Sequence, residues 1–218
     1  MMFGNRNGES MQVPLYQVYG RAGTSMNSAG FQSKFGKSNS KIGQRGEAVL
    51  MHKLRDRNNG WLPAEIPLFC SLIVPGKSSD IDFAMVNGNK ILLVDAKMYR
   101  QDGGWYWNFG DSPVMRRNFS KYRSKSGNQV KLSKSMIMAK DILSQKLPGY
   151  QVEAIVVFTT DPRNPRATAP NTTFLTYPGG VKAYNDAGAR KFINRFFRGT
   201  RRTPETLKAE HFLKSITQ

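Results

Sequence analysis

Residues 78–100 read SSDIDFAMVNGNKILLVDAKMYR, two apolar segments separated by Asn-Gly-Asn. Asn-Gly between apolar runs is the strongest short-range signal for a β-hairpin, so the stretch predicts two antiparallel strands joined by a tight turn. Asp80, Asp82 and Asp95 lie in or beside the apolar runs, and Lys97 follows two residues after the last aspartate. Because strands rich in Ile, Leu and Val rarely carry unpaired charges, these four residues are the first candidates for a functional site.

The position of the turn decides which aspartates oppose each other. A two-residue turn at 87–88 places Asp80 opposite Asp95, whereas a turn at 88–89 places Asp82 opposite Asp95. Side chains alternate between the faces of a strand, so both registers put the three aspartates and the lysine on one face, with opposed residues roughly 5 Å apart. A three-residue loop would break this arrangement.

Carboxylates at this spacing repel one another when ionised, and a divalent cation relieves the repulsion. Mg²⁺ is typically bound by one or two carboxylates together with water and phosphate oxygens. A neighbouring lysine could orient or deprotonate an attacking water, or stabilise charge that develops on a phosphate. The alternative is a hairpin face on which alternating polar residues simply meet water.

A helix is predicted over residues 42–57, and it carries a further candidate. Glu47 shares one helical stripe with Leu50, Met51 and Leu54, so its carboxylate points toward the core. Such a carboxylate is costly unless it is paired or bound to a cation. The alternative is that Glu47 lies at the exposed end of the stripe, where the helix dipole favours it.

A second helix is predicted over residues 128–145. Gln129 opens its stripe of Leu132, Met136 and Leu143, which points the amide toward the sheet and the same site. The alternative is an exposed polar residue in the first helical turn.

The remaining pattern predicts an α/β fold, with a mixed sheet flanked by helices. Strands are expected within 64–76, 152–160 and 172–177, with a short one within 13–19, and helices near 186–198 and 204–216. We divide the chain into a flexible basic N-terminal arm (1–38), a central α/β domain (39–180) and a C-terminal basic helical extension (181–218).

Composition narrows the classes of partner. The formal net charge is +18, which favours polyanions and above all nucleic acid. No apolar run approaches the roughly 18 residues of a membrane span, and there is no secretory signal, so we expect a cytoplasmic protein without a membrane partner. The single cysteine, Cys70, is expected to be a buried apolar residue, and two histidines give no zinc-binding pattern.

The stretch that follows the hairpin predicts the nucleic-acid contact. No acidic residue occurs between Ser112 and Lys140, and the segment is rich in basic residues with interspersed aromatics. Basic side chains neutralise phosphates, and aromatic side chains can stack on bases. Trp105 and Trp107 are expected to pack beneath the loop. The predicted phosphate contacts are Arg116, Arg117, Lys121, Arg123, Lys125, Lys131 and Lys134.

In order along the chain, "GQRGEAVLMHKL", "SSDIDFAMVNGNKILLVDAKMYRQDGGWYWN", "NQVKLSKSMIMAKDIL" and "VEAIVVFTTD" resemble the nuclease-related domain (NERD) family of the PD-(D/E)XK nuclease superfamily. The resemblance covers about residues 41–160 and implies a restriction-endonuclease-like fold. It departs from the family at two points. Asp80-Ile81-Asp82 stands where Gln-Ile-Asp is usual, and Asp95-Ala96-Lys97 where Glu-x-Lys is usual.

The resemblance also implies roles for individual residues. Asp82, Asp95, the Ala96 carbonyl and Glu47 would hold Mg²⁺ or Mn²⁺. Lys97 would be the catalytic lysine, and Gln129 would position it or the substrate. Asp80 is either a further ligand or a surface acid.

The activity expected is metal-dependent DNA cleavage in a bacterial, phage or mobile-element setting, with nicking and double-strand cutting both open. A homodimer is expected only if both strands are cut. The alternatives are a nuclease-fold nucleic-acid-binding protein without catalysis, and a basic structural protein.

Overall fold

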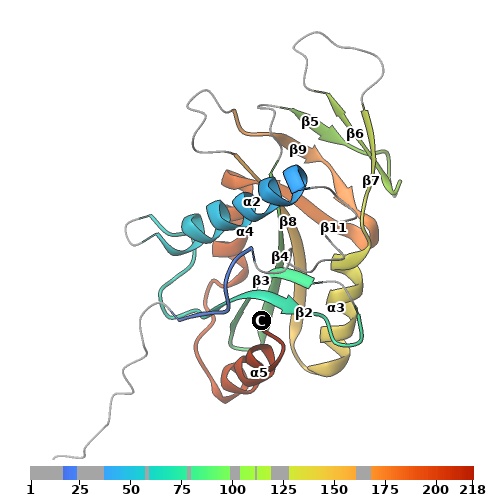
Figure 1. Cartoon of the computed structure of the whole chain (residues 1–218). Coiled ribbons are helices and arrows are strands. Elements are labelled where there is room, and N and C mark those ends of the chain that lie inside the picture. Colours follow the sequence, from blue (N-terminus) through green and yellow to red (C-terminus); the bar gives the residue numbers. More distant parts are fainter. Residues whose placement is uncertain are drawn as a thin grey trace, which may run out of the picture.

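The computed structural model describes residues 17–23, 37–56, 59–77, 80–98, 104–110, 112–118, 128–160 and 168–218. Its main element is a seven-stranded mixed sheet in the order β1-β2-β3-β4-β8-β11-β10 (Figure 1). β3 and β4 pair antiparallel, whereas β4, β8 and β11 run parallel. The predicted α/β fold with a mixed sheet flanked by helices is therefore confirmed. The strands are β1 (Val18–Tyr19), β2 (Leu68–Ile73), β3 (Asp80–Asn87), β4 (Lys90–Met98), β8 (Gln151–Thr159), β10 (Thr176–Tyr177) and β11 (Val181–Asn185).

The hairpin of β3 and β4 forms around a two-residue turn at Gly88-Asn89. Asn87 pairs with Lys90, and the register continues to Phe83 opposite Val94. Gly88 has φ 58°, a conformation that glycine adopts without steric cost and that suits the first central position of a tight hairpin turn. Of the two predicted registers, the structure therefore adopts the one that brings Asp82 opposite Asp95.

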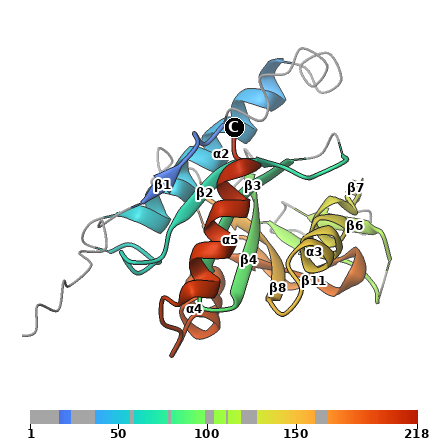
Figure 2. The ribbon, with the colours of Figure 1, turned by 90° about the horizontal axis from the view of Figure 1, so that it is seen from below.

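Helices cover both faces of the main sheet, and each face has its own apolar core. One core joins α2 (Lys37–Arg55) and α4 (Asp186–Phe196) to the sheet, and the other joins α3 (Ser135–Lys146) and α5 (Pro204–Ser215). Figure 2 shows α5 lying across β2 and β3, while α3 lies beside β8. The nearly continuous apolar sequence of β8 is explained by its position between these two layers.

A second, four-stranded sheet has the order β7-β6-β5-β9 and lies at the upper right of Figure 1, on the side away from α5. Its strands are β5 (Trp105–Trp107), β6 (Val114–Asn118), β7 (Asn128–Lys131) and β9 (Asn171–Phe174). The prediction of a helix from 128 is wrong for its first turn. Residues 128–131 pair with β6 instead, and the helix begins at Ser135.

The C-terminal residues predicted as an extension contribute to both cores. β11 pairs with β8 within the main sheet, and Ile193 of α4 and Leu213 of α5 are fully buried. Of the N-terminal arm, residues 17–23 are described, and β1 pairs there in parallel with β2. In the described ranges, no helix is long and apolar enough to cross a membrane.

Candidate active site

Asp95 and Lys97 form an ion pair on one face of β4. Lys97 Nζ donates a hydrogen bond to Asp95 Oδ1 at 2.7 Å, and the lysine side chain is 36% exposed. Across the hairpin, Asp82 is buried, and its Oδ2 accepts a hydrogen bond from the Ala96 N–H at 2.6 Å. The hairpin thus places an acid held by a peptide N–H and an acid paired to an ammonium within one short stretch of sheet.

Glu47 adds a carboxylate from α2. It is fully buried beside Leu50 and Leu54, which matches the stripe predicted from the sequence. Gly23 N–H donates to Glu47 Oε2 at 2.7 Å, whereas Oε1 is buried and has no hydrogen-bond partner among the residues that the structure describes. A buried carboxylate oxygen without a partner is costly, and a cation or a proton can satisfy it.

Burial raises the pKa of Glu47 from its ordinary 4.5 to about 7. The Gly23 N–H opposes this shift, and the charge of Asp80 adds to it. Burial likewise raises the pKa of Asp82 well above its usual range, and the nearby charges of Asp95 and Glu47 raise it further. These carboxylates are therefore close enough to disfavour each other's ionisation, and their crowding is the local cost of the arrangement.

The pKa of Lys97 is raised as well, and for a basic side chain this favours the charged form. Burial alone would lower its pKa, but the charges of Asp95 and Asp82 outweigh that effect, so the pKa of Lys97 lies above its ordinary value. Tyr177 of β10 contributes in the same direction. Lys97 is consequently an ammonium ion at neutral pH. Neither Tyr177 nor Gly23 was predictable from local sequence patterns, because both reach the site only through tertiary packing.

Carboxylate oxygens are the donors available at this site. Asp82 and Asp95 oppose each other, and Glu47 Oε1 has no hydrogen-bond partner among the described residues. Within the same ranges, no group of three or more His, Cys, Asp or Glu side chains is placed so that it could hold a metal ion. Metal binding here would therefore rest on one or two carboxylates completed by solvent and substrate oxygens, the kind of donor set that Mg²⁺ takes.

Gln129 does not occupy the predicted position. It lies on β7 opposite Arg116 and is exposed, because β7 pairs with β6 where a helix was expected. Its role in catalysis stays a prediction.

The predicted phosphate contacts fall partly within the described structure. Arg116 and Arg117 lie half-buried on β6, and Lys131 and Lys134 are exposed. Lys121, Arg123 and Lys125 lie outside the described residues. Trp105 is 55% exposed, so the expectation that it packs beneath the loop is wrong.

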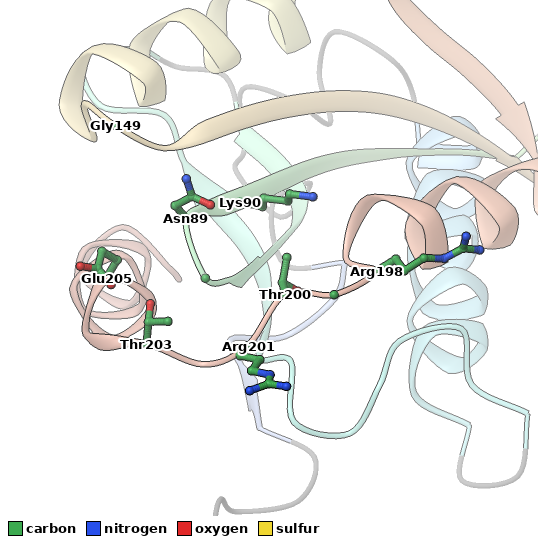
Figure 3. Close-up of a pocket in the computed structure, with 10 residues that line it drawn as sticks. Asn89, Lys90, Gly149, Arg198, Thr200, Arg201, Thr203 and Glu205 are labelled. Carbon is green, nitrogen blue, oxygen red and sulfur yellow. The ribbon is translucent and has the colours of Figure 1, made fainter.

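A hollow of about 590 Å³ lies at the other end of the hairpin, between Asn89, Gly149 and Glu205 (Figure 3). In this view the side chains of Arg198 and Arg201 point outward, and they do not converge on a common centre. Asn89 and Asp95 are separated by most of β4, about 20 Å at roughly 3.3 Å per residue. The hollow is therefore separate from the acidic site.

A family model described as the nuclease-related domain matches residues 42–159. The matched region includes Glu47, both hairpin strands and β8. No curated protein and no solved structure gives a significant match.

Proposed function

Because the chain belongs to the nuclease-related domain family, we propose that it is a metal-dependent endonuclease that hydrolyses phosphodiester bonds of DNA at the site formed by Asp82, Asp95, Lys97 and Glu47. The observation that carries this proposal is the β3–β4 hairpin. It aligns Asp82 with Asp95 and fixes Lys97 beside them, in a chain of net charge +18. A polyanionic substrate is attracted to such a chain, and the acids provide oxygen ligands at the sheet.

Asp82 and Asp95, with the Ala96 carbonyl, would hold Mg²⁺ or Mn²⁺, and Glu47 would assist the ion or its water ligands. The ion would polarise the scissile phosphate and lower the pKa of a water molecule. This assignment explains why an otherwise costly set of buried acids is maintained in one place.

Lys97 would act through its charge. Its raised pKa keeps it protonated at neutral pH, which supports electrostatic stabilisation of the phosphate over removal of a proton from water. Asp95 positions the ammonium through the 2.7 Å hydrogen bond. Asp82 is oriented in turn by the Ala96 N–H. The sequence left the base and charge roles of Lys97 open, and the electrostatics favour the second.

A supercoiled-plasmid assay tests the proposal. The full chain is incubated with plasmid in Mg²⁺, Mn²⁺ or EDTA, and nicked, linear and supercoiled forms are separated on a gel. We expect cleavage in Mg²⁺ or Mn²⁺ and none in EDTA, with a loss of at least about 100-fold in rate for Asp95→Asn and Lys97→Met.

A matched control exists in the same chain. Lys140 pairs with Glu153 at 3.0 Å, and its side chain is about as exposed as that of Lys97. This pair joins α3 to the first half of β8, whereas Lys97 lies beside Phe158 in the second half. Lys140→Met makes the same charge change as Lys97→Met and should leave cleavage intact. Wild-type protein that binds plasmid and cuts it in neither metal would instead support a non-catalytic nucleic-acid-binding protein. Nicked and linear products would also show whether one strand or both are cut, on which the predicted homodimer depends.

A further inference from the structure

The small sheet has one face turned to the core and one turned to solvent. Tyr106 of β5 and Met115 of β6 are buried in the core that contains α3. Alternation along the strands therefore places Trp105, Trp107 and Arg116 on the opposite side. We refer to this opposite side as the outer face, and its described residues include Trp105, Trp107, Arg116, Gln129, Lys131 and Phe174.

Pairing across the strands arranges the outer face in a row. Trp107 of β5 is opposite Arg116 of β6, which is in turn opposite Gln129 of β7. On its other side, Trp107 is in register with Phe174 of β9. Neighbouring strands lie about 4.8 Å apart, so one row presents two aromatic rings, a guanidinium and an amide in succession.

The aromatic rings of this face are unusually exposed. Phe174 is 66% exposed and Trp105 55%, and neighbouring Phe109 is 67% exposed. The Arg116 guanidinium lies over the Phe109 ring at 5.2 Å from its centroid. Large apolar side chains gathered on one exposed surface indicate a binding site, and cation–π contacts keep a basic group beside the rings.

Charge identifies the kind of partner. The described residues of the four strands include the basic residues Arg116, Arg117 and Lys131 and contain no Asp or Glu. Exposed rings interleaved with basic groups on a sheet match the bases and phosphates of a nucleic acid whose bases are unpaired. A duplex, whose bases are stacked and paired, would offer phosphates but no ring faces.

The outer face is also anchored close to the acidic site. The Tyr106 ring, on the inner side of β5, contacts the Phe158 ring at 5.0 Å between centroids. Phe158 is in register with Lys97. The sheet that carries the exposed rings thus packs against β8, the strand that pairs with β4 beside the ion pair.

From these observations we propose that the outer face binds single-stranded nucleic acid by stacking bases on Trp105, Trp107 and Phe174, with Arg116 and Lys131 contacting phosphates. This inference deepens the proposed nuclease function, and it rests on that function for the claim that the bound nucleic acid is a substrate. It assigns the enzyme a substrate with unpaired bases, such as a single strand, a flap or a melted segment.

Binding in EDTA separates this proposal from catalysis. Fluorescein-labelled dT20, U20 and a 20-base-pair duplex are titrated with the full chain, and fluorescence anisotropy gives each Kd. Base–aromatic stacking is worth about tenfold or more in affinity per ring, so Trp105→Ala and Phe174→Ala should each weaken dT20 binding roughly tenfold. Both substitutions conserve charge, so the salt dependence of binding should not change. Duplex binding should change by less than about twofold.

Leu207→Ala is the matched control, because Leu207 is 47% exposed and lies on α5, away from the small sheet. It should bind dT20 as the wild type does. If U20 binds as tightly as dT20, the rings stack on bases without discriminating between ribose and deoxyribose. Weaker U20 binding by the Trp105→Ala and Phe174→Ala variants would likewise support the proposal. Circular dichroism verifies that each variant is folded.

Three results would overturn the inference: wild-type affinity for dT20 in both aromatic variants, equal losses for duplex and single strand, or a change in oligomeric state on size-exclusion chromatography with unchanged binding. The last would assign the face to contacts between copies of the chain. If the rings bind single strands but the protein does not cleave plasmid, the proposed catalysis is wrong and this inference stands. If the protein cleaves plasmid but the aromatic variants bind dT20 and cleave as the wild type does, this inference is wrong and the proposed catalysis stands.

Discussion

Replacing Glu47 with Gln should stabilise the metal-free protein at alkaline pH. The substitution keeps the shape of the side chain and an oxygen that can accept the Gly23 N–H, but it removes the ionisable group. In the folded chain the pKa of Glu47 is about 7, against an ordinary value of 4.5. The folded state therefore holds the proton more tightly than the unfolded state, and unfolding becomes easier as the pH rises from 4.5 to about 7.

The size of the effect follows from this difference in pKa. At about 1.4 kcal/mol per pH unit, ionised Glu47 lowers the free energy of unfolding by about 3 kcal/mol at pH 8, and by about 1 kcal/mol at pH 5. Glu47→Gln should therefore exceed the wild type by about 3 kcal/mol at pH 8, and the gap should shrink by about 2 kcal/mol at pH 5. The pKa of Asp82 is also raised, partly by the charge of Glu47, so the gap between the two proteins reports Glu47 together with its effect on Asp82.

Urea denaturation in EDTA, followed by tryptophan fluorescence at pH 5, 6, 7 and 8, measures this gap. The control is Glu65→Gln, a substitution of an exposed residue, which should leave the pH dependence unchanged. A Glu47→Gln variant whose unfolding free energy falls in parallel with the wild type would show that Glu47 titrates normally. That result would also mean that Glu47 is not crowded by the other acids, so this crowding could no longer be used to argue for a bound cation.

Further changes probe the metal and the fold. Adding MgCl₂ at 100 times its Kd should increase the free energy of unfolding of the wild type by about 2.7 kcal/mol and so raise its Tm in a thermal-shift assay. Asp95→Asn should abolish this rise in Tm. A rise of equal size in the Asp95→Asn protein would contradict the assigned ligand. Arg202→Met should cost about 3 kcal/mol in chemical denaturation, since it leaves buried Glu210 without the cation 2.8 Å from Oε1. Stability unchanged from the wild type would mean that Glu210 is otherwise compensated. Thr203→Ala should cost about 1 kcal/mol by removing the cap of α5, and Thr203→Ser should restore it; equal losses in both variants would point to packing of the Thr203 methyl group.

The central hairpin was predictable from sequence because its signals are local. Asn-Gly-Asn between apolar runs predicts the turn, and alternation predicts which residues share a face. The choice between two registers was not local. It depended on whether Gly88 or Asn87 took the first turn position, and the structure places Gly88 there with a positive φ. Glu47 was predictable for the same reason, since helical periodicity alone places it among Leu50 and Leu54.

The small sheet was not predictable because its pairing is tertiary. Residues 128–131 adjoin the apolar spacing of α3, so periodicity extends the helix through them. Pairing with β6 provides backbone hydrogen bonds that local propensity does not anticipate. The same pairing turns Gln129 outward and leaves Trp105 in solvent, which accounts for both incorrect expectations about these residues.

The hydrogen bond from Gly23 to Glu47 has a practical consequence for anyone who trims this chain. A shortened version that starts at α2 would retain the whole matched family region, yet it would lack the N–H that holds down the pKa of this carboxyl. The pKa of Glu47, and any pH optimum that depends on it, would then lie higher than in the chain that retains Gly23. Activity profiles from such a fragment would describe a weaker acid than the one in the longer chain.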